Sequence, residues 1–335
     1  MTVTKKDTAA RKERKLREEH RVARKRVITL DAELERKEQE LRAALKIKGP
    51  VKVRPILPHK SSHTSEATAV AVLSDFHVEE EVMSKKVSGL NKYNLDIAKQ
   101  RSERVFQRIE RMIRKERQDV EIKTLVLFLG GDFISGNIHE ELLSTCLLRP
   151  IEAIMFAQEL LESGVRFLLE HTDLQIVCVC HVGNHSRLTR KVHYGTEQGN
   201  SLEYMMYHAM RSRFLDEKRI TFNIAEGYHT YLPVYDWTVR FHHGHNIRYW
   251  GGVGGLTIPL NKAIHQWNLT KQATCDVLGH FHEAMSMRRF VVNGSLIGFS
   301  PFAIAMKAEY QPPIQQFFLL DKKRGRTVEI PLFAE

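Results

Sequence analysis

The first part of the chain alternates short apolar runs with longer segments of helical spacing. Three near-continuous apolar runs predict strands buried on both faces of a sheet, over residues 68–74, 124–130 and 174–181. Between the first two runs, side chains four residues apart predict one face of a long helix, with Arg101 at its solvent edge. The other positions of this face are Ile97, Val105, Ile109 and Ile113. Residues 152–170 predict a second helix.

After about residue 219 the pattern becomes rich in strands. Seven short runs are expected to form them, over residues 220–224, 229–234, 237–243, 275–278, 289–292, 315–320 and 326–330. An α/β first part followed by a β-rich second part favours two packed sheets with helices on the outside. We therefore expect an α/β fold for the body of the chain.

The N-terminal part differs from the rest, and residues 1–49 are expected to form a basic, helical arm. Residues 5–26 contain no Gly or Pro and almost no large apolar side chain, so they cannot bury a face. Residues 27–48 predict an amphipathic helix that packs on the body, on a partner protein or on another copy in a homo-oligomer. Its stripe is formed by Leu30, Leu34, Leu41 and Leu45. Residues 50–66 contain three prolines and are expected to be a linker to the main domain, residues 67–335.

Charge also separates the arm from the body. Residues 1–60 hold 19 Lys and Arg against 9 Asp and Glu, whereas residues 61–335 hold 32 against 31. The basic run suits either an arm that follows the phosphates of nucleic acid or a solvated face that keeps the protein soluble. Both interpretations stay open, because Glu18 and Glu19 interrupt the run and no aromatic residue is interleaved for base stacking.

The composition excludes a disordered chain, because 42% of the 335 residues are apolar and 27% are charged. No apolar run approaches the ~18 residues of a membrane-spanning helix. The N-terminus leads directly into charged residues, and the four cysteines form no CxxC pair. A cytoplasmic protein without a membrane partner is therefore expected.

Five apolar runs end in residue types that bind metal ions. The clusters are Asp75-Phe76-His77, Gly130-Gly131-Asp132, Gly183-Asn184-His185, His242-His243-Gly244-His245 and Gly279-His280-Phe281-His282. Ligands at the carboxyl ends of strands converge on one crevice in α/β sheets. A single His is commonly a packing residue, but five such clusters in this order indicate a metal centre.

This ordered set resembles the calcineurin-like metallophosphoesterase superfamily, whose pattern is D-x-H, GD, GNH, H and GHxH. The resemblance spans residues 68–285 and implies a four-layer α/β/β/α sandwich of two mixed sheets. It also implies two cations, the first held by Asp75, His77 and His282, the second by Asn184, His243 and His280, with Asp132 bridging them. In this scheme a hydroxide between the cations attacks phosphorus, and His185 assists the leaving group.

The chemistry of these ligands is consistent with that assignment. Carboxylate, amide and imidazole ligands suit Mn²⁺, Fe, Zn²⁺ or Ni²⁺ better than Mg²⁺ or Ca²⁺. We therefore expect two divalent cations and prefer Mn²⁺ among these metals. His243 is preferred to its neighbours because it directly precedes glycine. His242 points to the opposite face of its strand, and His245 lies beyond the turn.

Residues around the motifs restrict the class of phosphoester that the chain is expected to hydrolyse. Phosphoprotein phosphatases carry GDxxDRG, and the chain lacks that Arg after Asp132, which argues against a protein phosphatase. They also carry an acid where this chain has Ser186, so the orientation of His185 must depend on other neighbours. Arg187 and Lys191 are candidates to bracket the phosphates of a diester, and His139 to line the substrate side. The alternative for Arg187, Lys191 and His139 is that each is a solvated surface residue without a role in substrate binding.

The Gly-Gly-Asp sequence at the bridging Asp resembles the DNA repair exonuclease branch, the nuclease subunits that process double-strand breaks. The sequence therefore predicts a two-metal phosphodiesterase that acts as a nuclease on nucleic acid, with DNA as the expected substrate. The alternative is a phosphodiesterase or phosphatase for a small nucleotide, with the arm used for partner binding or oligomerisation. A scaffolding protein with a vestigial centre would need a broken ligand set, and all seven ligand positions are present.

Overall fold

The computed structural model describes residues 21, 25–27, 29, 54–58, 65–249 and 255–335. The chain divides into two units, Met1–Gly49 and Pro50–Glu335. In the first unit, the few described residues are helical. The leucine stripe of the predicted amphipathic helix lies outside the described residues. The arm, its boundaries and its partner-binding role therefore stay predictions.

A mixed six-stranded sheet lies at the centre of the second unit, in the order β11-β10-β1-β2-β3-β4. The strands are β1 (Glu66–Leu73), β2 (Glu121–Leu129), β3 (Gln175–Cys180), β4 (Ile220–Ile224), β10 (Ile314–Asp321) and β11 (Gly325–Phe333). Strands β1 to β4 run parallel, whereas β10 is antiparallel to β1 and β11 to β10. The carboxyl ends of β1, β2 and β3 therefore meet at one edge.

A second mixed sheet of five strands packs on the first, in the order β5-β6-β7-β9-β8. It comprises β5 (Thr230–Val234), β6 (Trp237–Phe241), β7 (Cys275–Leu278), β8 (Met285–Met287) and β9 (Phe290–Val292). Strands β6, β7 and β9 are parallel, and β5 and β8 are the antiparallel edges. Of these strands, only β8 was absent from the sequence prediction.

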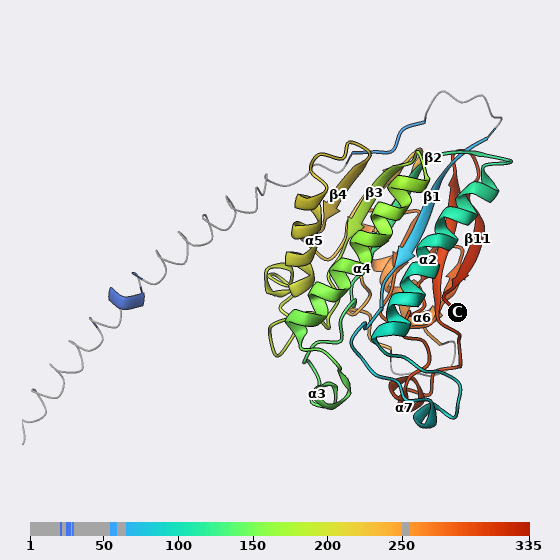
Figure 1. The fold of residues 1–335 in the computed structure, drawn as a ribbon. Coiled ribbons are helices and arrows are strands. Elements are labelled where there is room, and N and C mark those ends of the chain that lie inside the picture. The colour runs from blue at the N-terminus through green and yellow to red at the C-terminus, as the bar shows by residue number, and fades with distance from the viewer. Residues whose placement is uncertain (1–20, 22–24, 28, 30–53, 59–64, 250–254) are drawn as a thin grey trace, which may run out of the picture. The chain divides into compact units, whose positions relative to one another are not determined.

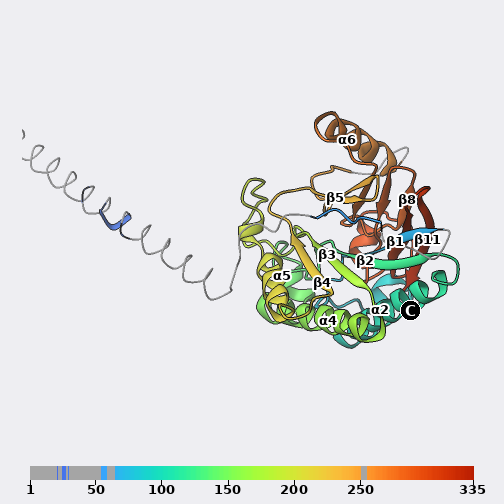
Figure 2. The same ribbon diagram turned by 90° about the horizontal axis from the view of Figure 1, so that it is seen from above.

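Helices cover the outer face of each sheet, which gives the four layers seen in Figures 1 and 2. Helices α2 (Leu95–Glu116), α4 (Pro150–His171) and α5 (Leu202–Arg213) pack on the first sheet, and α6 (Thr257–Thr270) packs on the second. Shorter elements are η1 (Ser84–Val87), α3 (Leu142–Thr145), η2 (Gln198–Asn200) and α7 (Pro301–Ala305). The predicted α/β/β/α sandwich is confirmed. None of the described helices is long and apolar enough to cross a membrane.

The apolar core lies in these layers because side chains alternate along each strand. In β1, Ala69, Ala71 and Leu73 pack against the helices, and Val70 and Val72 pack against the second sheet. This two-sided burial explains why the strand reads as a continuous apolar run in the sequence.

Two residues depart from the sequence prediction. Arg101 is buried rather than at a solvent edge, because its guanidinium donates hydrogen bonds to the carbonyls of Leu296 and Ile297. Ile56, inside the predicted linker, is buried and forms a parallel β-bridge with Val234. The chain is thus attached to the second sheet before β1 begins.

Candidate metal centre

The five predicted clusters follow the carboxyl ends of β1, β2, β3, β6 and β7 and are tied together by backbone hydrogen bonds. The Asp75 amide donates to the carbonyl of Gly131 (2.9 Å), and the His77 amide donates to that of Asp132 (3.2 Å). Between the later clusters, the Gly279 amide donates to the carbonyl of His243 (2.9 Å). The loops therefore form one surface on which the polar side chains converge.

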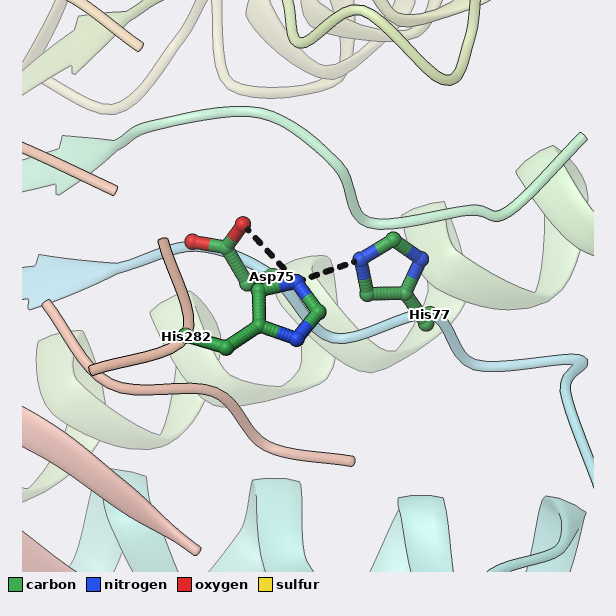
Figure 3. Close-up of side chains that lie close together, drawn as sticks. All are labelled: Asp75, His77 and His282. Carbon is green, nitrogen blue, oxygen red and sulfur yellow. Dashed lines mark hydrogen bonds and ion pairs between the residues drawn. The ribbon is translucent and has the colours of Figure 1, made fainter. Parts of the chain in front are cut away.

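The first group of ligands is Asp75, His77 and His282, whose candidate ligand atoms all lie within 4.8 Å of one another (Figure 3). His282 Nε2 lies 3.5 Å from Asp75 Oδ1 and 3.1 Å from His77 Nε2. Nitrogens bound at about 2.0–2.1 Å to one ion lie roughly 3 Å apart, so this spacing suits a shared cation. Burial lowers the pKa of His77 well below its ordinary value, which keeps the imidazole neutral, as a metal ligand must be.

The second group is Asp132, His243 and His280. His243 Nδ1 lies 2.7 Å from the carbonyl of Gly130, which only accepts, so Nδ1 carries the proton. The other ring nitrogen, Nε2, faces Asp132 Oδ2 at 2.9 Å. Burial lowers the pKa of His243, but the Asp132 carboxylate outweighs burial and raises it to about 10. A positive charge is thus favoured between the two side chains, in the form of a proton or a metal ion.

Asn184 adds a further candidate ligand of the predicted second cation. Its Oδ1 is buried and has no hydrogen-bond partner among the described residues. A buried amide oxygen without a partner costs free energy, which coordination of a cation would offset. Together with the mixed imidazole and carboxylate groups, this orphaned oxygen makes a set of donors that fits divalent metal ions.

Asp132 connects the two groups. It belongs to the group with His243 and His280 and also to a third group with His77 and His185. Its Oδ1 accepts a hydrogen bond from the His185 amide (2.8 Å). Burial alone would raise the pKa of Asp132, but His243 and His185 hold it well below its usual range. The carboxylate is therefore ionised and is shared by two of the candidate ligand groups.

His243, rather than its histidine neighbours, joins the ligand groups. His242 Nε2 instead lies 3.4 Å from Asp276 Oδ1, on the side where Arg240 forms a buried ion pair with the same carboxylate. His245 Nε2 lies 2.8 Å from Glu197 Oε1. The structure thus places the three rings in different environments.

His185 lies at the edge of the first group. Its ring packs edge-on against that of His77, with the centroids 4.8 Å apart. Its Nδ1 lies 2.9 Å from the carbonyl oxygen of Ser135, so Nδ1 carries a proton. This carbonyl is the neighbour that orients His185 in place of the acid missing at Ser186.

Five candidate ligands have left-handed backbone conformations, which non-glycine residues rarely adopt. They are Asp75 (φ 57°), His77 (φ 48°), Asp132 (φ 53°), His280 (φ 73°) and His282 (φ 56°). Such conformations persist only where the surrounding structure enforces them. They are concentrated at functional sites. Gly183 permits the close approach of two loops, since a Cβ there would lie 2.0 Å from Asp132 Oδ1.

The three candidate substrate residues are placed differently. The His139 ring lies 5.9 Å from that of His185, between centroids. Arg187 donates from Nη1 to the carbonyl of Asn184, and burial lowers its pKa while Asp132 opposes this shift. Lys191 is exposed, and its backbone carbonyl accepts a hydrogen bond from Thr189 Oγ1 (2.6 Å). The structure therefore brings His139 and Arg187, but not Lys191, beside the ligands.

Glu203, which the sequence did not single out, ties two ligand loops together. Its Oε1 accepts from the Phe133 amide (2.7 Å), and its Oε2 accepts from the Gly183 amide (2.7 Å) and from Ser186 Oγ (3.0 Å). Burial, with Asp132 nearby, raises the pKa of Glu203 to about 7. No local pattern indicates this role, because it depends on where α5 packs.

Comparisons with known proteins add little to these observations. No protein-family model and no curated protein matches the chain. One similar solved structure is a hypothetical protein from Pyrococcus horikoshii OT3, with 12% identity, a TM-score of 0.36, and coverage of 80% of this chain and 89% of that chain. Another is Vps29 from Chaetomium thermophilum, with 10% identity, a TM-score of 0.27, and coverage of 79% and 97%. The resemblance to metallophosphoesterases therefore still rests on the motifs.

Proposed function

We propose that this chain is a two-metal phosphodiesterase that acts as a nuclease on DNA. The observation that supports this most is the pair of adjacent ligand groups joined through Asp132. When bound at such a centre, two divalent cations activate water as a nucleophile and neutralise the oxygens of a phosphoester. The first cation is assigned to Asp75, His77 and His282, the second to Asn184, His243 and His280, and Asp132 serves both.

His185 is proposed to deliver a proton to the leaving oxygen. Because its Nδ1 hydrogen is directed at the Ser135 carbonyl, the second proton of the imidazolium is carried on Nε2. The Asp132 carboxylate accepts a hydrogen bond from the backbone amide of His185 and so holds His185 beside the ligands. Proton transfer from Nε2 to the departing alkoxide would complete cleavage of the P–O bond.

A phosphodiester suits the remaining groups better than a phosphomonoester. The two negative charges of a phosphomonoester are commonly bound by an Arg side chain, and the loop after Asp132 supplies no Arg for this role. The nearby His139 and Arg187 provide hydrogen-bond donors and one fixed positive charge instead. Two flanking groups of this kind are suited to the single negative charge of each phosphate in a nucleic-acid strand.

A small cyclic or linear nucleotide diester is the second candidate. It is favoured by the nearly balanced charge of residues 61–335, with 32 Lys and Arg against 31 Asp and Glu. A protein that follows many phosphates ordinarily presents a basic surface. In the nuclease proposal, the basic arm must supply that surface.

The test is digestion of end-labelled single- and double-stranded DNA with Mn²⁺. We expect cleavage by the wild type and a loss of roughly 10²–10⁴-fold in rate for His185→Ala, with both cations still bound. The matched control is His171→Ala, at an exposed histidine at the end of α4, which should cleave like the wild type.

Absence of cleavage by the wild type, with hydrolysis of a chromogenic diester retained, would contradict the nuclease and favour the small nucleotide. Loss of a cation in His185→Ala would show that His185 is a ligand instead of the proton donor.

A further inference from the structure

Ser135 contacts two histidines of the metal centre at once. Its hydroxyl Oγ lies 2.8 Å from His77 Nδ1, and its backbone carbonyl lies 2.9 Å from His185 Nδ1. The Ser135 side chain is fully buried, which shields its contacts from bulk solvent. One residue therefore faces a ligand of the first cation and the proposed proton donor.

Glu80 completes the arrangement. Ser135 Oγ donates its hydrogen bond to Glu80 Oε2 at 3.0 Å. A hydroxyl has one proton, and here it is directed at the carboxylate. The lone pairs of Oγ are left to face His77, so at that contact Ser135 accepts and His77 Nδ1 donates.

We propose that Glu80 and Ser135 form a relay that fixes the tautomer of His77 and thereby prepares its Nε2 to bind a cation. With the proton held on Nδ1, the lone pair lies on Nε2, the atom that faces His282 at 3.1 Å. Ligating histidines in proteins commonly have their second nitrogen held by such a partner, whose loss typically costs about 10–100-fold in metal affinity. In this relay, Ser135 and Glu80 are positioning residues that act on the cation through His77.

The relay separates two functions within one residue. Ser135→Ala removes the hydroxyl that contacts His77 but keeps the backbone carbonyl that contacts His185. The substitution should therefore weaken the first cation site while leaving the second site and the orientation of His185 unchanged.

The first experiment is a calorimetric titration of the full chain with Mn²⁺. For Ser135→Ala we expect one of the two cations to bind about 10–100-fold more weakly. Glu80→Ala should shift the same cation in the same direction, and Glu80→Gln, which keeps an acceptor oxygen, should restore most of the affinity. The matched control is Ser144→Ala, at an exposed serine of α3. Repeating the titration with His280→Ala, which removes a ligand of the second group only, identifies the affected cation.

The second experiment measures the tautomer directly, by ¹⁵N NMR of histidine-labelled protein without added metal. In the wild type, Nδ1 of His77 should be protonated and Nε2 unprotonated. In Ser135→Ala and Glu80→Ala, this signal should move towards a mixture of both tautomers. A merely structural serine would not produce that change.

Equal weakening of both cations, or unchanged affinity together with an unchanged tautomer, would overturn the relay. The inference rests on the metal centre of the proposed function, but neither measurement uses DNA. A chain that binds two cations and cleaves no DNA would refute the nuclease while leaving the relay standing.

Discussion

At the scale of single residues, Asp132 is proposed to connect the two cation sites. Its carboxylate oxygens face His243 on one side and the amide of His185 on the other. Asp132→Asn keeps the shape but removes the negative charge that both cations would share. We expect both to bind more weakly, by at least the roughly 10–100-fold that the loss of an outer partner costs.

Metal content after dialysis, measured by elemental analysis, checks this prediction. Asp216→Asn, at an exposed loop position, is the control and should retain both ions. Loss of only one ion from Asp132→Asn would mean that Asp132 does not bridge.

The sequence predicted the residues whose chemistry is visible locally. Asp75, Asp132 and His280 each lie just beyond the end of an apolar strand, and their small neighbours mark the turn. Glu203 and Glu80 gave no such signal, because a glutamate in a helix or loop is ordinarily solvated. Their roles arise only when the fold carries their carboxylates to buried amide and hydroxyl donors.

At the scale of elements, the strands were more predictable than the later helices. Strand β4 was predicted at its observed bounds because its run is short and is bounded by charged residues before it and by Glu226-Gly227 shortly after it. Helix α5 was missed because its buried face includes the polar residues Glu203 and His208, which break the apolar stripe. Helix α6 was missed because it buries only Leu260 and Ile264, too few to give a helical pattern.

The proposed role of the N-terminal arm can be tested by deleting it. The attachment of Ile56 to β5 lies beyond residue 49, so removal of residues 1–48 spares it. We expect the truncated chain to keep its metal content and its hydrolysis of a chromogenic diester. Binding to DNA should weaken, and its dependence on salt should become shallower, since fewer counterions are released.

Electrophoretic mobility shift assays at several salt concentrations, run with both proteins, measure this difference. Unchanged DNA affinity would remove the arm from the substrate interface. Loss of metal together with DNA binding would show that the arm is needed for the body to fold.

At the scale of the whole molecule, each proposed cation site would take ligands from loops that follow strands of both sheets. Asp75 and His77 follow β1 of the first sheet, whereas His282 follows β7 of the second. Likewise, Asp132 follows β2, and His243 and His280 follow β6 and β7. A bound ion would therefore hold the two halves of the sandwich together at one end.

Ions that bind the folded chain and not the unfolded one should stabilise it by mass action. At a free concentration 100 times Kd, one ion contributes about 2.7 kcal/mol. We expect Tm in a thermal unfolding scan to fall by several degrees on addition of a chelator and to recover with Mn²⁺. Asp132→Asn is the matched comparison and should show a smaller response. Equal Tm values for the wild type with and without Mn²⁺ would contradict a cation link between the sheets.

The left-handed backbone at five ligand positions has an evolutionary consequence. Each such residue costs about 1–3 kcal/mol, which glycine would largely avoid. If these residues bind cations, selection for that binding must hold aspartate and histidine there against this cost. In a descendant that no longer uses the centre, drift should replace them with glycine or asparagine and gain stability. The residues at positions 75, 77, 132, 280 and 282 of any homologue would then record whether its centre is still in use.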